Sequence, residues 1–338
     1  MSRPRPIAIL FASEAAANYP MAGIPAAARM LRDAPEHADV MVAVPGGWQP
    51  TERCLREAAR LAPGVRWRAV DLSQVGEADW FALPDCDADG ASWSADPPAA
   101  MDLPQLRSEA RKIIAATGKP GDGIVSRHLN RPISQAMTRV FLRWSGARPW
   151  HATLLAGLTG VAMAASLFFG GEPGLIAGAV LFQLASIIDG VDGETARATF
   201  RTSARGAMFD SVTDAVTNLS FVAGVSYNLY ASGHEAAGTA GAIGFALLAT
   251  GSVLLAIQSR RDGGDFTFDA LKTRMRSRPS ALREWLVRLT MRDFYALASC
   301  LAILAGGASL LLFVFASVAA GWLVFVCAMI VRGGRIAG

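Results

Sequence analysis

The chain has 338 residues, of which 52% are hydrophobic and 18% are charged. This composition excludes an ordinary soluble protein of this length and indicates a membrane protein. The formal net charge is only +4, and nucleic acid is not among the expected partners. Charges, prolines and short apolar runs alternate up to about residue 145, whereas apolar runs of membrane-spanning length follow it. The sequence therefore predicts two parts with different surroundings.

The first part has the pattern of a small α/β domain. Three strand-like runs alternate with two helical stretches: PIAILFA, DVMVAVP and VRWRAVDL for the strands, and PAAARMLRDA and TERCLREAARLA for the helices. Such alternation is typical of α/β folds. The first apolar run has only about six residues, which is short for a signal peptide. We therefore expect residues 1–105 to form a soluble domain in the cytoplasm.

One stretch of this domain, MAGIPAAARMLRDA at residues 21–34, resembles the element that follows the nucleotide-binding loop of nucleotidyltransferases. In that family the loop carries Gly-x-Gly-x-Arg and a Pro-Lys pair. This chain has SEAAANYPMAG at residues 13–23, which offers neither a glycine cradle nor a basic side chain for a triphosphate. The resemblance therefore implies a nucleotidyltransferase-like domain that is inactive.

Residues 106–147 are predicted to link the two parts and to contain an amphipathic helix. The stretch IVSRHLNRPISQAMTRVFLRW places apolar side chains on one helical stripe: Ile133, Met137, Val140, Phe141 and Trp144. Arg139 and Arg143 lie on the other side. This pattern is typical of a helix that lies in the plane of the membrane interface.

Residues 148–333 are predicted to form six membrane-spanning helices, since about 20 apolar residues cross the hydrocarbon core. The approximate limits are 149–169, 173–189, 206–230, 236–258, 291–309 and 311–331. The sequence AGGAS at 305–309 supplies a turn between the last two. The predicted fold class is thus an α-helical integral membrane protein with six transmembrane helices, preceded by a small soluble α/β domain.

Basic residues mark one side of the membrane. The connections at 170–174, 231–237 and 305–309 contain no Lys or Arg, whereas the other connections and the segment before the first span are rich in Arg. By the positive-inside rule, both termini and the loop after the second span are cytoplasmic. We therefore expect a protein of the inner (cytoplasmic) membrane whose site faces the cytoplasm.

Four aspartates lie at the cytoplasmic ends of the second and third spans. Asp189 and Asp192 are three residues apart, and Asp210 and Asp214 are four apart, so each pair shares one helix face. Uncompensated charges at this depth cost at least about 2.5 kcal/mol each, so a cation or a water-filled cavity is expected. Carboxylates without His or Cys favour Mg2+ or Mn2+, and two ions are expected. Such a site suits transfer of a phosphate-linked group, and a membrane cation transporter that uses intramembrane carboxylates is the alternative.

The aspartates belong to a longer motif, Asp189-x2-Asp192-Gly193-x2-Ala196-Arg197-x8-Gly206-x3-Asp210-x3-Asp214. Over about residues 120–335 the chain resembles the CDP-alcohol phosphotransferases (CDP-alcohol phosphatidyltransferases), whose signature it matches at every fixed position. The resemblance implies a six-helix membrane enzyme that moves a phosphate-linked alcohol from a CDP-linked donor to an acceptor hydroxyl and releases CMP. It implies that the aspartates bind the metal, with Asp214 as ligand, general base or both. Gly193, Ala196, Arg197 and Gly206 would line the CDP site.

A second stretch, KPGDGIVSRHLNRPIS at residues 119–134, resembles the junction in fused inositol-phosphate cytidylyltransferase and di-inositol-phosphate phosphate synthase proteins. In that subgroup Pro-Asn-x-x-Thr opens the first span. This chain has PWHAT, which keeps Pro149 and Thr153 but has Trp150 in place of Asn. The resemblance implies that Thr153 contacts the CDP group.

The substrates follow from the resemblance only as classes. It implies a donor of the CDP-diacylglycerol or CDP-inositol type, an alcohol or polyol-phosphate acceptor, membrane lipid as a partner and a homodimer. The acceptor phosphate would need a basic pocket. The candidates, at the cytoplasmic ends of the fourth and fifth spans, are Arg260, Arg261 and Arg292.

Overall fold

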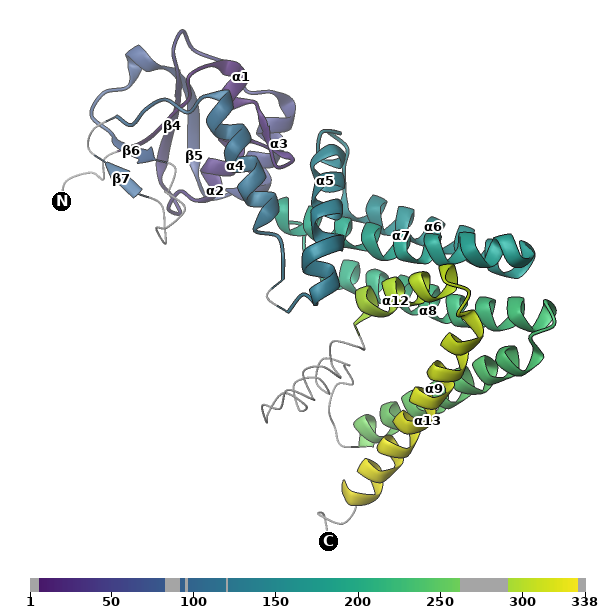
Figure 1. The fold of residues 1–338 in the computed structure, drawn as a ribbon. Coiled ribbons are helices and arrows are strands. Elements are labelled where there is room, and N and C mark those ends of the chain that lie inside the picture. The colour runs from purple at the N-terminus through teal and green to yellow at the C-terminus, as the bar shows by residue number, and fades with distance from the viewer. Residues whose placement is uncertain (1–5, 83–91, 95–96, 120, 262–290, 334–338) are drawn as a thin grey trace. The chain divides into compact units, whose positions relative to one another are not determined.

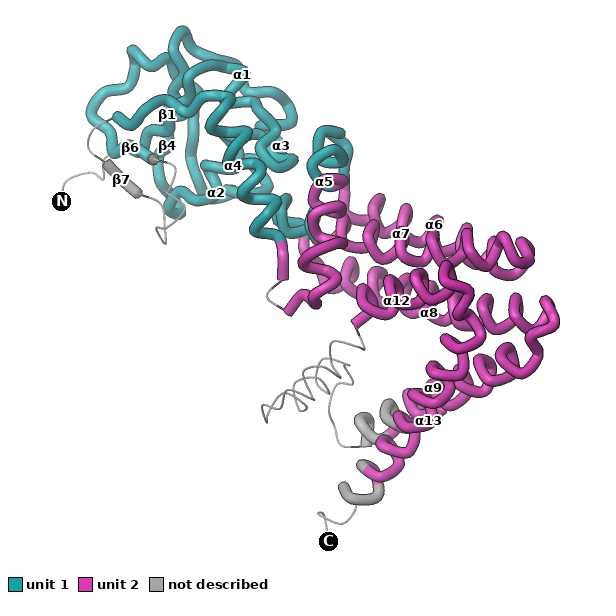
Figure 2. The backbone as a smooth tube through the Cα atoms, in the orientation of Figure 1, with its two compact units in different colours: residues 1–117, 138–147, 194–201 teal, residues 118–137, 148–193, 202–338 magenta. Residues whose placement is uncertain are grey.

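The computed structural model describes residues 6–82, 92–94, 97–119, 121–261 and 291–333. The chain divides into two compact units, which Figure 2 shows in teal and magenta. Unit 1 comprises Met1–Thr117, Thr138–Ala147 and Glu194–Arg201, and unit 2 comprises Gly118–Met137, Arg148–Gly193 and Thr202–Gly338. The division follows packing rather than chain order, because two short segments separated from Met1–Thr117 in the sequence also belong to unit 1.

A five-stranded sheet forms the centre of unit 1, in the order β5-β4-β1-β6-β7 (Figure 1). Its strands are β1 (Ile7–Leu10), β4 (Asp39–Val44), β5 (Arg66–Asp71), β6 (Asp79–Ala82) and β7 (Ser92–Ser94). The first four pair in parallel, and β7 pairs antiparallel to β6. Ile9 lies opposite Val42, which lies opposite Ala69, so the strand centres are apolar, as in sheets covered on both faces. The predicted α/β region is confirmed, and β6 and β7 extend it beyond the three expected strands.

Several helices of unit 1 begin at residues whose side chains cap them. The Thr51 hydroxyl accepts a hydrogen bond from the Cys54 amide at the start of α3 (Glu52–Leu61). Asp102 and Gln105 form a capping box at the start of α4 (Leu103–Ala115). The other elements are α1 (Glu14–Ala17), β2 (Pro20–Met21), β3 (Ile24–Pro25), α2 (Ala26–Arg32) and the short 3-10 helix η1 (Leu72–Gln74).

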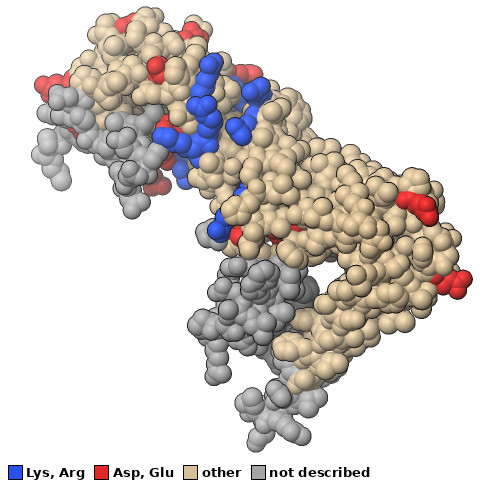
Figure 3. Space-filling view, in the orientation of Figure 1, with Lys and Arg blue, Asp and Glu red and all other residues tan. Residues whose placement is uncertain are grey.

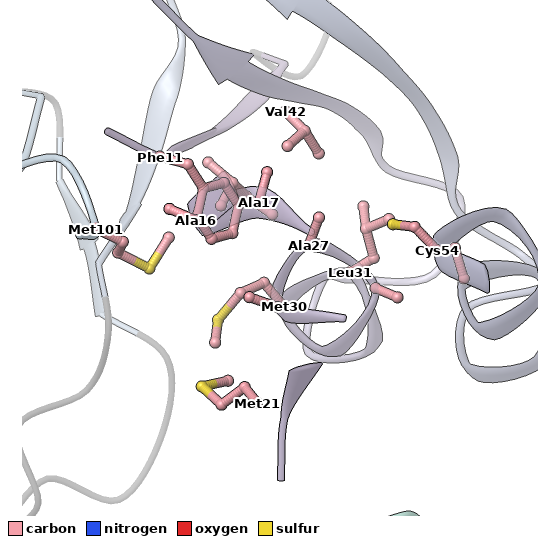
Figure 4. Packing of buried hydrophobic residues seen from close by; sticks show 14 of the residues in the cluster. Phe11, Ala16, Ala17, Met21, Ala27, Met30, Leu31, Val42, Cys54 and Met101 are labelled. Atoms are coloured by element: carbon pink, nitrogen blue, oxygen red, sulfur yellow. The ribbon is translucent and has the colours of Figure 1, made fainter. Parts of the chain in front are cut away.

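The core of unit 1 lies between the sheet and its helices. In Figure 4, Phe11, Leu31 and Cys54 lie among the packed side chains of this core, and all three are fully buried. Burial raises the pKa of the Cys54 thiol to about 11, so it stays protonated at neutral pH and acts as a packing residue.

Unit 2 is built mainly from helices (Figure 1). The chain enters through a single π-helical turn, η2 (Ser126–Asn130), and α5 (Arg131–Phe141). The long helices are α6 (Pro149–Phe169), α7 (Gly171–Ala198), α8 (Ala204–Ala231), α9 (Glu235–Arg261), α12 (Arg292–Leu304) and α13 (Ala308–Gly333). Helix α8 packs against α6 and α9, and α9 packs against α13. Phe182 of α7 stacks on Phe221 of α8 with ring centroids 3.9 Å apart, so an aromatic pair joins these two helices.

Two turns of unit 2 are fixed by particular residues. Gly306, between α12 and α13, has a φ of +77°, which glycine adopts without strain, so the turn predicted at 305–309 is present. The turn between α6 and α7 is held by Asn228 of α8. Its Nδ2 donates hydrogen bonds to the carbonyls of Leu167 and Gly171, each at 2.8 Å. A buried amide from a third helix thus completes this turn.

Four of the described helices are long and apolar enough to cross a membrane: Pro149–Phe169, Gly171–Ala198, Glu235–Leu254 and Ala308–Ala328. Figure 3 shows broad surface on one face of this part of the chain where side chains are uncharged. The chain is therefore an integral membrane protein. Helices α8 and α12 cover the third and fifth predicted spans, but α8 is interrupted by polar residues and α12 has 13 residues. The number six stays a prediction.

Candidate functional site

Three of the four predicted aspartates form one cluster in unit 2. Asp189 lies on α7, and Asp210 and Asp214 lie one turn apart on α8. One carboxylate oxygen from each lies within 4.8 Å of the other two, and all three side chains are partly buried. The spacing of four residues places both α8 carboxylates on one helix face, as the sequence predicts. This acidic cluster could bind a metal ion.

Asp192 is placed differently from the other three aspartates. It is buried, with 7% of its surface exposed. Its Oδ2 accepts a hydrogen bond of 2.6 Å from the hydroxyl of Thr153 on α6. Thr153, for which the sequence predicts a CDP contact, is therefore bound to an aspartate of the motif. The structure thus gathers three carboxylates and gives the fourth a partner on another helix.

Arg292 supplies the positive charge beside the acidic cluster. It is the first residue of α12, and its Nη1 lies 3.1 Å from Oδ1 of Asp189. The same nitrogen donates a hydrogen bond to Oδ1 of Asp214, with which it forms a second ion pair. The sequence predicts Arg292 as an acceptor contact together with Arg260 and Arg261, whose side chains lie outside the described residues. Arg292 therefore reaches the predicted site, where it contacts carboxylates.

The chemistry of the acidic cluster fits a hard divalent cation. Its members offer only carboxylate oxygens, the ligand type that Mg2+ and Mn2+ prefer. Oδ1 of Asp210 is buried and accepts no hydrogen bond from the part of the chain that the structure describes. Burying a charged oxygen without a partner is costly, and a bound cation would satisfy it. Arg292 compensates the other two carboxylates, so Asp210 carries the clearest demand for an ion.

A cavity of about 190 Å³ lies beside the acidic cluster, with Asp189, Asp214 and Arg292 in its wall. The rest of the wall is also polar and is formed by Lys119, Asp122, Ser126, Asn130, Arg131, Ser134, Ser186, Gly190 and Asp293. The wall thus combines three basic side chains with four carboxylates and three serine hydroxyls. The cavity is therefore suited to a small polar molecule that can form charge-assisted hydrogen bonds next to the carboxylates.

Arg131 and Lys119 are site residues that the sequence analysis missed. Arg131 binds Asp122 through two hydrogen bonds, Nε to Oδ2 at 2.7 Å and Nη2 to Oδ1 at 3.1 Å. Burial alone would raise the pKa of Asp122, but the bonds from Arg131 and from the Lys119 amide outweigh it and lower this pKa. The signal was present in KPGDGIVSRHLNRPIS, which the sequence analysis used only as a mark of family resemblance.

Glycine allows α5 and α7 to approach closely at the cavity wall. A Cβ atom at Gly190 would lie 3.0 Å from Oγ and 3.1 Å from Cβ of Ser134. Nearby, Asn130 accepts a hydrogen bond from Gln183 and donates one to Ser186, a buried polar chain without a counterpart in the sequence analysis. Gly190 therefore sets how near the amphipathic helix comes to the helix that carries Asp189.

The remaining motif residues occupy the ends of α7 and α8. Gly206 lies in the first turn of α8, where its amide donates a 3.1 Å hydrogen bond to the capping hydroxyl of Ser203. Gly193 is the last residue of the α7 segment in unit 2, and Ala196 and Arg197 belong to unit 1. There Nε of Arg197 donates a 2.7 Å hydrogen bond to the carbonyl of Thr117. The structure places these residues at helix termini and leaves their predicted CDP contacts untested.

The structure thus has apolar helices of membrane-spanning length, a carboxylate cluster that could bind a metal ion, and a polar cavity beside this cluster. Residues 148–267 match the family model described as CDP-alcohol phosphatidyltransferase. This part of the chain is thus similar to the CDP-alcohol phosphatidyltransferase family. The family resemblance predicted from the aspartate motif is confirmed.

Several curated proteins are similar to part of the chain. A bifunctional IPC transferase and DIPP synthase of Thermococcus kodakarensis is 35% identical over 186 residues, which are 54% of this chain and 39% of that protein. The protein of the same name from Rubrobacter xylanophilus is 34% identical over 179 residues, 53% of this chain and 38% of the relative. That from Aquifex aeolicus is 34% identical over 131 residues, 38% and 29% of the two chains. The chain thus spans about two fifths or less of each relative.

Proposed function

We propose that the protein is a divalent-metal-dependent CDP-alcohol phosphotransferase, which moves a phosphate-linked alcohol from a CDP-linked donor to an acceptor hydroxyl and releases CMP. The observation that carries this proposal is the cluster of Asp189, Asp210 and Asp214, with one oxygen of each within 4.8 Å of the others, inside a matched family domain. Mg2+ or Mn2+, as two ions, would neutralise the donor diphosphate and the charge that develops on CMP.

The protein side chains would divide the work of the reaction between them. Asp189, Asp192, Asp210 and Asp214 would hold the metal, and Thr153 would orient Asp192 through its hydrogen bond. Asp214 would also accept the proton of the acceptor hydroxyl while the oxygen of that hydroxyl bonds to phosphorus and CMP leaves. This requires that Arg292 release Asp214 when substrate enters, since the two are ion-paired. Gly193, Ala196, Arg197 and Gly206 would contact the cytidine and diphosphate of the donor.

The basic side chains in the cavity wall support an acceptor that carries a phosphate. Lys119, Arg131 and Arg292 line it beside Asp214, so a phosphate bound there would place a neighbouring hydroxyl near the general base. The similar proteins are named as DIPP synthases, which agrees with a polyol-phosphate acceptor. A donor of the CDP-diacylglycerol type would make a phospholipid, and one of the CDP-inositol type a polar phosphodiester.

The proposed arrangement in the membrane has six spans, both termini in the cytoplasm and a site open to the cytoplasm of an inner membrane. Residues 1–105 would form an inactive nucleotidyltransferase-like domain, residues 106–147 the linker with an interfacial helix, and residues 148–333 the phosphotransferase domain. Two copies of the chain would form a homodimer. The distribution of basic residues supports the orientation. Arg260 and Arg261 would be additional acceptor contacts.

The test is CMP release by the purified protein with Mg2+, each of the two donor types and a panel of neutral and phosphorylated alcohols. We expect release with one donor type, loss of release with Asp210→Asn, and normal release with Glu235→Gln, an exposed acid in the first turn of α9. Cation flux through liposomes without nucleotide, together with no CMP from any pairing, would overturn the proposal in favour of a transporter.

A further inference from the structure

The end of α7 is held by side chains of the N-terminal sheet domain within unit 1. The last residues of the helix and those that follow it expose carbonyls with no partner in the helix itself, as at any helix C-terminus. Three consecutive carbonyls, those of Ala198, Thr199 and Phe200, accept hydrogen bonds from arginines that precede them by more than 130 residues in the chain. The sheet domain thus caps this helix.

Arg29 of α2 provides the first contact. It is 5% exposed, and its Nη2 donates to the carbonyl of Ala198. Its remaining hydrogen bonds go to the carbonyls of Met21 (3.2 Å) and Ala22 (3.3 Å) in the β2–β3 hairpin. Burial lowers the pKa of Arg29 to about 10, so the guanidinium remains charged at neutral pH. Burying a charge costs free energy unless the charge is well hydrogen-bonded. Among the described residues, every hydrogen-bond acceptor of Arg29 is a backbone carbonyl.

Arg60 of α3 provides the second contact. Its Nη2 donates to the carbonyl of Thr199 at 2.9 Å and its Nη1 to that of Phe200 at 3.1 Å. Glu57 pairs with Arg60 at 2.7 Å and also with Arg201, so one carboxylate joins the arginine of the sheet domain to the segment it binds. Arginine suits this position because its fork reaches two carbonyls and its charge favours the negative end of the helix dipole.

Backbone conformation and close packing at Phe200 and at the β2–β3 hairpin agree with this contact. Phe200 has a φ of +52°, the left-handed conformation common after a helix end, and its ring lies 3.9 Å from the guanidinium of Arg32. Gly23 of the hairpin has a φ of +86°, and a Cβ there would lie 2.8 Å from Leu142 and 3.2 Å from Thr199. The β2–β3 hairpin, which is part of the stretch that resembles a nucleotidyltransferase, therefore packs against the residue that follows α7.

We propose that Arg29 and Arg60 are positioning residues, through which the sheet domain fixes the last turn of α7 and hence the motif residues Ala196 and Arg197. The sheet domain would then act as a cap for the end of α7. This inference rests on the proposed function, because Ala196 and Arg197 are assigned to the CDP group there. Without the cap the last turn would fray, and the donor would bind more weakly while the carboxylates that carry the chemistry stayed in place.

The test compares Arg60→Gln with Arg56→Gln in the full-length protein. Arg56 lies one turn earlier on the same helix, and its side chain is 71% exposed. Among the described residues it pairs with Glu52 alone, at 3.5 Å, so it is a matched control. In Arg60→Gln we expect amide exchange at Thr199, Phe200 and Arg201 to accelerate about tenfold, as for one lost hydrogen bond to a charged group. The KM for the CDP donor should rise by about the same factor, and kcat should change by less than about threefold. Arg60→Lys should recover part of both effects, and Arg56→Gln should show neither.

The exchange measurement separates this inference from the proposed function. If the native protein releases no CMP, the proposed function fails, and exchange at 199–201 still decides whether the cap exists. If exchange rises throughout the sheet strands, Arg60→Gln has unfolded the domain, and Phe200→Ala, which removes from the capped segment the ring that lies over Arg32, decides instead. Unchanged exchange at 199–201 with an unchanged donor KM, or a loss in kcat alone, would overturn the inference.

Discussion

Arginine does opposite work in the two units. In unit 2, Arg292 binds two ionised carboxylates, so its charge balances theirs and competes with any cation that enters. In unit 1, Arg29 and Arg60 bind neutral backbone carbonyls, so their contacts hold the shape of a helix end and leave the charge of the site unchanged. The first kind of contact can be exchanged during a reaction, whereas the second has to persist. Substitutions should therefore separate charge compensation from positioning.

Loss of a cluster carboxylate should have the largest effect on activity. Asp189→Asn removes one oxygen ligand of the acidic cluster and one partner of Arg292. We expect CMP release to fall by roughly a thousandfold, because several kcal/mol of charge stabilisation would be lost with the metal. Chelation of divalent ions should have the same effect and be reversed by Mg2+. Asp39→Asn, at an exposed ion pair of the sheet, is the control, and a similar loss there would contradict the assignment.

Arg292→Gln should test whether the arginine and the metal share the same carboxylates. We expect kcat to fall about tenfold, since the charge on Asp189 and Asp214 would be unbalanced during the reaction. The Mg2+ concentration for half-maximal activity should fall as well, because a competing cation has been removed. Arg292→Lys should keep more of the native metal dependence. A higher Mg2+ requirement in Arg292→Gln would show that the arginine supports metal binding.

Arg131→Gln should act on the acceptor alone. We expect the KM for a phosphorylated acceptor to rise about tenfold, with little change for a neutral alcohol or the CDP donor. The lowered pKa of Asp122 means that its pair with Arg131 is present above the ordinary aspartate range and is lost only as the pH falls below it. Titration of Asp122 should therefore not change the effect of Arg131→Gln on the acceptor KM across neutral pH. Arg139→Gln, on the exposed side of α5, is the control.

Thr153→Val should give the smallest loss. It removes the 2.6 Å hydrogen bond to Asp192 and conserves the volume of the side chain. We expect kcat to fall about fivefold, near the net value of one hydrogen bond. Thr159→Val on the same helix is matched, because that hydroxyl donates only to the carbonyl of Leu155 in its own helix. Equal effects of the two substitutions would mean that Thr153 matters for the helix and not for Asp192.

The acidic cluster could be predicted from the sequence because its order is local. The spacing of Asp210 and Asp214 determines a common helix face, and the motif joins them to Asp189 across one short connection. The strands of unit 1 were predictable for a similar reason, since alternation of apolar runs and helical stretches is a property of neighbouring residues.

Contacts made across long sequence distances could not be predicted in the same way. Arg292 binds Asp214, which lies 78 residues earlier in the chain. From the sequence, the positive charge of Arg292 predicts an anionic partner but does not identify that partner. Arg29 and Arg60 resemble ordinary surface arginines of amphipathic helices, and nothing local marks carbonyls 169 and 139 to 140 residues away as their partners. Lys119 and Arg131 were visible but looked like the basic residues that precede any first span.

The amide of Asn228 has a consequence for the order of assembly. It donates to Leu167 and Gly171, which precede it by 61 and 57 residues, so the turn between the first two spans is completed by a helix synthesised after both. Helices α6 and α7 can enter the membrane as a pair, but their hairpin gains its last internal partners only when α8 arrives. Three helices, rather than two, are the smallest piece of this fold that contains both hydrogen bonds from Asn228 to that turn.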